Sequence, residues 1–271
     1  MVSSPIGIFD SGIGGLTVWK HIKALLPKER LIYLADTAFC PYGLKSKEAL
    51  VDRCRMITRF FLQQGCKMVV IACNTATAAA VFSLRAEFDI PFVAMEPAVK
   101  PAILGTQTGV IGVLATKGTL QWYHQPLAKC KVKILEQAGE GWVEAIERGD
   151  LESEQTQQMV AHLVQPMLDK GADFLVLGCT HYPYLLPVIR KVAGPGVTIL
   201  DPAPAVARQV RSVLAKNKDL YEGPSQGEDV FYYTYSSLVN VLPSAVANTA
   251  KGGTIKWRPY TFENSSAIAA N

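Results

Sequence analysis

The feature that most constrains this chain is a repeated alternation of short apolar runs with longer segments of helical spacing. The short runs are rich in Val, Ile and Leu and end in small or polar residues. This alternation is typical of a parallel α/β fold, because parallel strands need a crossover between them, usually a helix. We expect strands at residues 6–9, 31–34, 68–72, 92–94, 109–114, 133–135, 174–177, 198–200 and 231–234, and helices at 15–26, 47–64, 76–88, 118–128, 154–170, 185–193 and 203–214.

Polar residues at four strand ends repeat at a fixed spacing. Asp10 and Cys73 follow two strands of the first half, and Thr116 and Cys179 follow two strands of the second half. Both intervals are 63 residues, and the two cysteines are 106 residues apart. We infer a duplication that produces two similar parallel-sheet α/β domains facing each other. Because open parallel sheets bind ligands beyond the carboxyl ends of their strands, Cys73 and Cys179 should meet in one active-site cleft.

Composition excludes several classes of protein. The chain has 271 residues, 49% of them hydrophobic, so it is neither disordered nor fibrous. Its net charge of +4 comes without a basic run, which gives little support for binding nucleic acid or a membrane surface. The apolar run at 68–84 is interrupted at 73–77 and falls short of the ~20 residues that cross a bilayer. With no basic segment before the first strand, we expect a cytoplasmic protein.

The six cysteines show neither a Cys-x-x-Cys pair nor a metal-binding spacing with histidine. We therefore expect free thiols and no metal site. Cys54, Cys66 and Cys130 fit the role of small buried hydrophobic residues. Cys73 and Cys179 differ because each directly precedes an expected helix, whose N-terminus favours the thiolate.

Two thiols on opposite faces of a small ligand suit the inversion of a carbon centre. One base removes a proton from one face while the other, protonated, returns a proton to the opposite face. Redox dithiol chemistry is the main rival, but it is disfavoured by the missing Cys-x-x-Cys pair. Two cysteines simply packed in a core are the structural alternative, although the polar residues that follow both are poor choices for a core.

Four motifs together resemble the glutamate racemase family, whose members interconvert L- and D-glutamate without a cofactor and supply D-glutamate for peptidoglycan. The motifs are GIFDSGIGGL at 7–16, DTAFCPYG at 36–43, ACNTA at 72–76 and GCTHYP at 178–183. The glycine-rich part of the first motif, taken alone, would be a weak phosphate-loop pattern. Phe39 departs from the arginine of many relatives, and residues 95–98 match only some members, so subfamily, partners and regulation are less constrained than the reaction.

The resemblance implies two domains and a set of catalytic residues. The first domain comprises 1–97 with 205–271, and the second comprises 98–204. By the family pattern Cys73 and Cys179 are the two bases, with Asp10 near the first and His181 near the second. An assisting glutamate on the His181 side corresponds best to Glu147. Its competitors are Glu144 and Glu152.

The resemblance also implies a substrate site for L- and D-glutamate built from neutral donors and backbone amides. No cofactor, nucleic acid or membrane is implied, and a homodimer is compatible with the family. The implied substrate-binding residues are Asp10, Ser11, Pro41, Tyr42, Gly43, Asn74, Thr75, Thr116, Thr119, Thr180 and His181.

Other functions with the same fold remain alternatives at this point. A related cofactor-independent racemase, for example of aspartate, would differ in its anchoring residues. A decarboxylase of the same superfamily would need only one of the two cysteines. A non-catalytic sensor of small ligands would be expected to lose one base, whereas both are present here.

Overall fold

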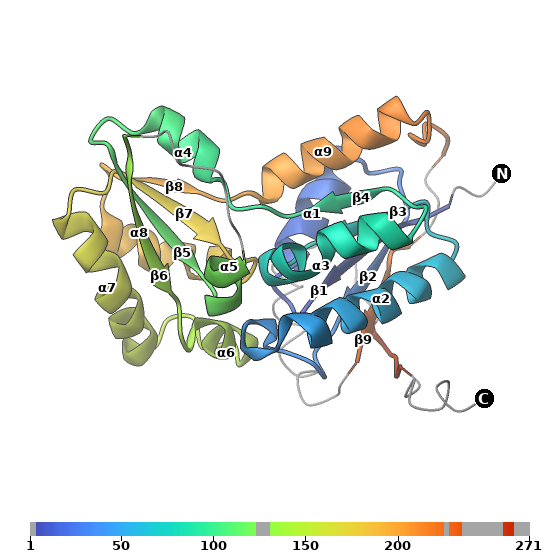
Figure 1. Cartoon of the computed structure of the whole chain (residues 1–271), viewed down its shortest axis with the longest axis horizontal. Coiled ribbons are helices and arrows are strands. Elements are labelled where there is room, and N and C mark those ends of the chain that lie inside the picture. The colour runs from blue at the N-terminus through green and yellow to red at the C-terminus, as the bar shows by residue number, and fades with distance from the viewer. Residues whose placement is uncertain (1–3, 123–130, 225–227, 235–256, 263–271) are drawn as a thin grey trace.

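The computed structural model describes residues 4–122, 131–224, 228–234 and 257–262. It contains two sheets side by side, each flanked by helices (Figure 1). The first sheet has the order β10-β9-β2-β1-β3-β4 and the second has the order β6-β5-β7-β8. All strand pairs within the described residues are parallel. The structure therefore confirms the predicted class of two parallel α/β domains.

The strands of the first sheet come from both ends of the chain, and those of the second come from its middle. In the first sheet they are β1 (Ile6–Asp10), β2 (Leu31–Ala35), β3 (Met68–Ile71), β4 (Phe92–Ala94), β9 (Val230–Tyr233) and β10 (Trp257–Pro259). In the second they are β5 (Val110–Ala115), β6 (Lys133–Ala138), β7 (Phe174–Gly178) and β8 (Thr198–Leu200). The exact domain boundaries, at residues 97 and 204, stay a prediction.

The two sheets repeat one strand order, as the predicted duplication requires. The order β2-β1-β3-β4 recurs as β6-β5-β7-β8. The registers differ by one residue, because Phe9 lies beside Ile71 whereas Ala115 lies beside Gly178. The two 63-residue intervals in the sequence therefore do not correspond to the same strand register in the two sheets.

The helices lie on both faces of each sheet. Those that pack on the first sheet are α1 (Leu16–Leu25), α2 (Lys47–Gln63), α3 (Asn74–Glu87) and α9 (Ala203–Lys216). The others are α4 (Val99–Gly105), α5 (Lys117–Trp122), α6 (Trp142–Glu147), α7 (Glu154–Asp169) and α8 (Leu186–Ala193), with short 3-10 helices η1 (Tyr42–Leu44) and η2 (Tyr182–Leu185).

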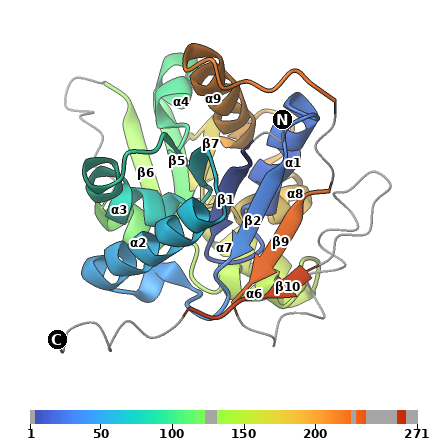
Figure 2. The same ribbon diagram turned by 90° about the vertical axis from the view of Figure 1, so that its right-hand side faces the viewer.

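Strand β1 carries no charged or polar side chain before its last residue, Asp10, because both of its faces are covered. Ile6 and Ile8 belong to the core cluster that includes α1 and α9, while Phe9 belongs to the cluster formed with α2 and α3. Figure 2 shows α2 and α3 on one side of this sheet and α1 on the other. A strand covered on both faces has no solvent side, so its residues do not alternate between apolar and polar.

Among the described α-helices and strands, three short elements were not predicted from the sequence. Helices α4 and α6 have only seven and six residues, and β10 has three. Such lengths hold too few apolar repeats to show a helical or strand period. The predicted helix at 118–128 is described only as far as Trp122, and both Cys130 and the predicted frayed tail at 264–271 lie outside the described residues.

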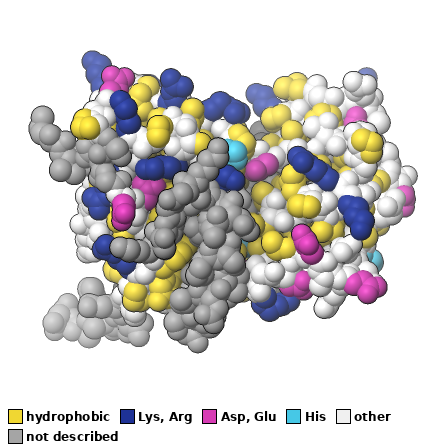
Figure 3. All heavy atoms as spheres, turned by 180° about the vertical axis from the view of Figure 1, so that it is seen from behind, with side chains coloured by type: hydrophobic (Ala, Val, Ile, Leu, Met, Phe, Trp, Pro, Cys, Tyr) yellow, Lys and Arg dark blue, Asp and Glu magenta, His cyan; other side chains and the backbone are white. Residues whose placement is uncertain are grey.

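Among the described residues, no helix combines the length and apolarity needed to cross a bilayer. On the face drawn in Figure 3, Lys and Arg side chains are interspersed with Asp and Glu.

Candidate active site

A cavity of about 180 Å³ lies where the carboxyl ends of the strands of the two sheets meet. Cys73, which follows β3, and Cys179, which follows β7, both line it. The predicted site residues that line this cavity are Ser11, Pro41, Tyr42, Gly43, Cys73, Asn74, Thr75, Thr116, Cys179, Thr180 and His181. Asp10, Thr119 and Glu147 lie behind this lining and act on it through other side chains.

Cys73 caps the N-terminus of α3, as its place before a helix predicted. Its Sγ accepts a hydrogen bond from the backbone N–H of Ala76 at 3.5 Å, and the residue is 5% exposed. Burial nevertheless raises the pKa of this thiol well above its usual range, and the charge of Asp10 raises it further, outweighing the Ala76 N–H. The helix N-terminus favours the thiolate of Cys73, as expected, but desolvation is the larger effect and the net shift favours the protonated thiol.

Cys179 is placed differently from the prediction. Thr180 and His181 separate it from η2, and α8 begins only at Leu186. No α-helix therefore starts directly after this thiol. Its polar partner is a side chain instead: Cys179 Sγ lies 3.9 Å from His181 Nδ1.

His181 forms a buried ion pair with Glu147. Its Nε2 lies 2.5 Å from Glu147 Oε1, and the two residues are 1% and 6% exposed. Burial by itself lowers the pKa of the imidazole, but its contacts with Cys179 and Glu147 and the charge of Asp10 outweigh this and raise the pKa well above the usual range. The His181 ring thus lies between Glu147 and the sulfur of Cys179, in surroundings that favour its protonated form.

The three candidate glutamates have different environments. Glu147, at the end of α6, contacts His181. Glu144 lines the cavity, and Glu152 is exposed to solvent. The geometry favours Glu147 as the partner of His181.

Asp10 is fully buried behind the cavity. Its carboxylate accepts hydrogen bonds from the Gly12 N–H and from Thr180 Oγ1, each at 3.0 Å. Burial raises its pKa, although the charge of His181 and these hydrogen bonds oppose the shift. Asp10 therefore influences Cys73 by its charge while Thr180 links it to the second domain.

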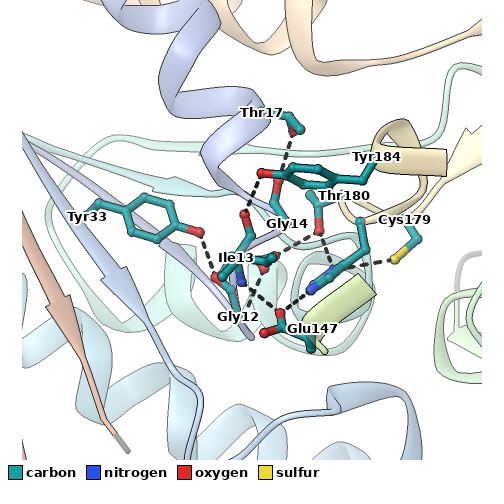
Figure 4. Close-up of polar contacts among 11 residues, drawn as sticks. Gly12, Ile13, Gly14, Thr17, Tyr33, Glu147, Cys179, Thr180 and Tyr184 are labelled. Carbon is teal, nitrogen blue, oxygen red and sulfur yellow. Dashed lines mark hydrogen bonds and ion pairs between the residues drawn. The ribbon is translucent and has the colours of Figure 1, made fainter. Parts of the chain in front are cut away.

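The glycine-rich loop at residues 11–15 docks against the second domain (Figure 4). The Ile13 N–H donates to Glu147 Oε1 at 2.8 Å, and Tyr184 Oη donates to the Ile13 carbonyl at 3.2 Å. A Cβ on Gly12 would overlap the Glu147 carboxylate, and one on Gly14 would overlap His181. Sequence reasoning missed this role, because the contact joins positions more than 130 residues apart.

Hydroxyl groups form a second link across the cavity. Thr75 Oγ1 lies 2.8 Å from Thr116 Oγ1 and 3.2 Å from Thr119 Oγ1. Thr119 thus supports two threonines that line the cavity without lining it itself.

The side chains of two other predicted anchors, Tyr42 and Asn74, differ in whether they already have a partner. The Tyr42 hydroxyl donates a hydrogen bond to Asp36 at 2.6 Å. The Oδ1 of buried Asn74 has no hydrogen-bond partner among the described residues.

No cluster of three His, Cys, Asp or Glu side chains arranged to hold a metal ion occurs within the described part of the chain. The polar groups on the cavity wall are mainly thiols, hydroxyls and an amide. They can hold a small polar ligand and move protons to and from it.

Residues 6–210 match the Asp/Glu/hydantoin racemase family. The chain belongs to this family. It is 49% identical over 231 residues to a glutamate racemase from Herpetosiphon aurantiacus, covering 84% of this chain and 91% of that protein. Similarity to glutamate racemases over this length indicates an amino-acid racemase, an isomerase.

Solved structures of family members have the same fold. A glutamate racemase from Bacillus anthracis, isoform RacE1, superposes with a TM-score of 0.84 at 31% identity, covering 96% of this chain and 98% of that one. The enzyme from Francisella tularensis, solved with D-glutamate, has a TM-score of 0.82 at 28% identity, covering 96% and 98%. The two-domain racemase architecture extends over nearly the whole chain.

Substitution of Gly12 by alanine tests the docking of the loop. The added methyl group must displace the Glu147 carboxylate, so we expect racemase turnover to fall by about 100-fold or more while the fold persists, since loss of positioned acid–base groups costs that much. Gly196→Ala is the matched control, because nothing lies within 4 Å of its Cβ position. Wild-type turnover in Gly12→Ala, with circular dichroism confirming folding of both variants, would contradict the docking role.

Proposed function

We propose that this racemase interconverts L- and D-glutamate by a cofactor-independent transfer between two cysteines. One observation carries the proposal: Cys73 and Cys179 line the same cavity from different sheets. A ligand held between them presents one face to each sulfur. Relatives named glutamate racemases support glutamate as the substrate, and D-glutamate would serve the synthesis of peptidoglycan.

The environments of the two thiols suggest the resting distribution of protons. The raised pKa of Cys73 favours the protonated thiol. Next to Cys179, the His181 ring lies between the sulfur and Glu147, and its contacts with both raise the pKa of the imidazole. We infer that the resting enzyme carries a protonated Cys73 thiol and that Cys179 acts as the base for the enantiomer that faces it.

The reaction then balances in protons. The Cys179 thiolate takes the Cα proton from one enantiomer, and the electron pair remains on Cα as a carbanion. The Cys73 thiol donates its proton to the opposite face of Cα, which forms the other enantiomer. The return reaction uses the same groups with the protons exchanged, with Asp10 acting on Cys73 and His181 on Cys179.

The anchoring groups are proposed from the cavity lining. Ser11, Thr75, Thr116 and Thr180 supply hydroxyls, and Asn74 supplies an amide. Residues 41–43 line the cavity as well, and their backbone polar groups are available to the substrate. Neutral donors of this kind can hold carboxylates without an arginine.

Replacing either proposed base should nearly abolish turnover. Purified enzyme with L-glutamate and no added cofactor should form D-glutamate, detected by chiral chromatography or circular dichroism. Cys73→Ser and Cys179→Ser should each lower the rate by at least about 100-fold in both directions, because a serine hydroxyl is too weak an acid to replace a thiol.

Cys66→Ser is the control, because it removes a buried thiol outside the cavity. Substantial racemisation by either active-site variant would overturn the two-base assignment. Turnover of aspartate but not glutamate by the wild-type enzyme would favour the related aspartate racemase.

Asp10 and His181 should affect the two directions of racemisation unequally. Asp10→Asn alters the surroundings of Cys73, whereas His181→Asn alters those of Cys179. Because two enantiomers have equal free energies, kcat/KM must change equally in both directions, but kcat and KM need not. We expect each variant to lower kcat more in one direction than in the other, and the more affected direction should differ between the two variants. Initial rates measured from each enantiomer test this. Equal losses of kcat in both directions for both variants would show that these residues only position the substrate.

A further inference from the structure

An ion pair lies at the edge of the cavity, apart from the thiols. Lys117 Nζ, at the start of α5, contacts Glu140 Oε1 at 2.6 Å. Both residues line the cavity, yet their side chains are 63% and 68% exposed. The pair therefore lies where the cavity opens to solvent.

The charges around this opening are unequal. Among the described residues that line the cavity, Lys117 is the only Lys or Arg, whereas Glu140 and Glu144 are both acids. Glutamate has two carboxylates and one ammonium group, so its net charge is negative at neutral pH. Among the described residues that line the cavity, a negatively charged substrate entering this opening therefore meets one exposed cationic side chain, that of Lys117, which is already paired.

We propose that Lys117 captures the substrate, exchanging its contact with Glu140 for a carboxylate of the arriving glutamate. This inference rests on the proposed function. Exposed ion pairs contribute little to stability, so an incoming carboxylate can replace Glu140 at low cost. Glu140 thereby competes with the substrate carboxylate for Lys117. The pair affects the affinity for substrate and takes no part in proton transfer.

Lys117→Met removes the proposed capture group. At low ionic strength we expect the KM for glutamate to rise by about two- to fivefold, the range typical of one exposed charge pair, with the loss concentrated in KM and not in kcat. The difference from wild type should shrink at about 0.5 M salt, because ions screen exposed charges. Lys100→Met is the matched control, since Lys100 is exposed on α4 and does not line the cavity.

Glu140→Gln separates capture from a general effect of charge. It frees Lys117, so it should lower KM in the wild-type background by about twofold or more and have a clearly smaller effect in the Lys117→Met background. Additive effects of the two substitutions would overturn the proposed exchange. So would a wild-type KM for Lys117→Met, an equal rise in Lys100→Met, or a rise that salt does not reduce.

These outcomes are distinct from failure of the proposed function. If the wild-type enzyme racemises glutamate but Lys117→Met keeps its KM, the capture role is wrong and the two-cysteine proposal stands. If the wild-type enzyme does not racemise glutamate, the proposed substrate is wrong, and the capture role that rests on it falls as well.

Discussion

The buried contact between Glu147, His181 and the loop at 11–15 is the interaction on which the site depends. One carboxylate oxygen of Glu147 accepts from the Ile13 N–H and also pairs with His181 Nε2. A charge buried this deeply is costly unless a partner compensates it, so the ion pair and the docked loop require each other. This contact joins the loop of the first domain to the second domain behind the cavity. The glycines at 12 and 14 are what permit this approach.

The two thiols are not equivalent in this arrangement. Cys73 is a buried helix cap near an aspartate, whereas Cys179 lies beside an imidazolium. Racemisation needs a base on one face and an acid on the other, so an asymmetric pair is suited to begin turnover in one direction. The duplicated strand order provides the two opposed positions, and the neighbours of the two sulfurs differ.

Local patterns in the sequence predicted the long elements and both cysteine positions, because apolar periodicity and polar strand ends are short-range signals. What they missed depends on long-range packing. The family resemblance already favoured Glu147 over Glu144 and Glu152, but its contact with His181 depends on how α6 packs, which local patterns do not show. The raised pKa of Cys73 follows from burial by the fold, which the position of a helix end alone does not reveal. Likewise, the engagement of the Tyr42 hydroxyl by Asp36 is visible only in three dimensions.

The origin of the proton on the product tests the two-base account most directly. In heavy water, one sulfur removes the original proton from the Cα of L-glutamate, and the other sulfur delivers a deuteron that comes from the solvent. At early times the D-glutamate formed should therefore carry deuterium at Cα, while the remaining L-glutamate stays largely protiated, as measured by mass spectrometry after chiral separation. Early D-glutamate that is mostly protiated would indicate a single base serving both faces and would contradict the account.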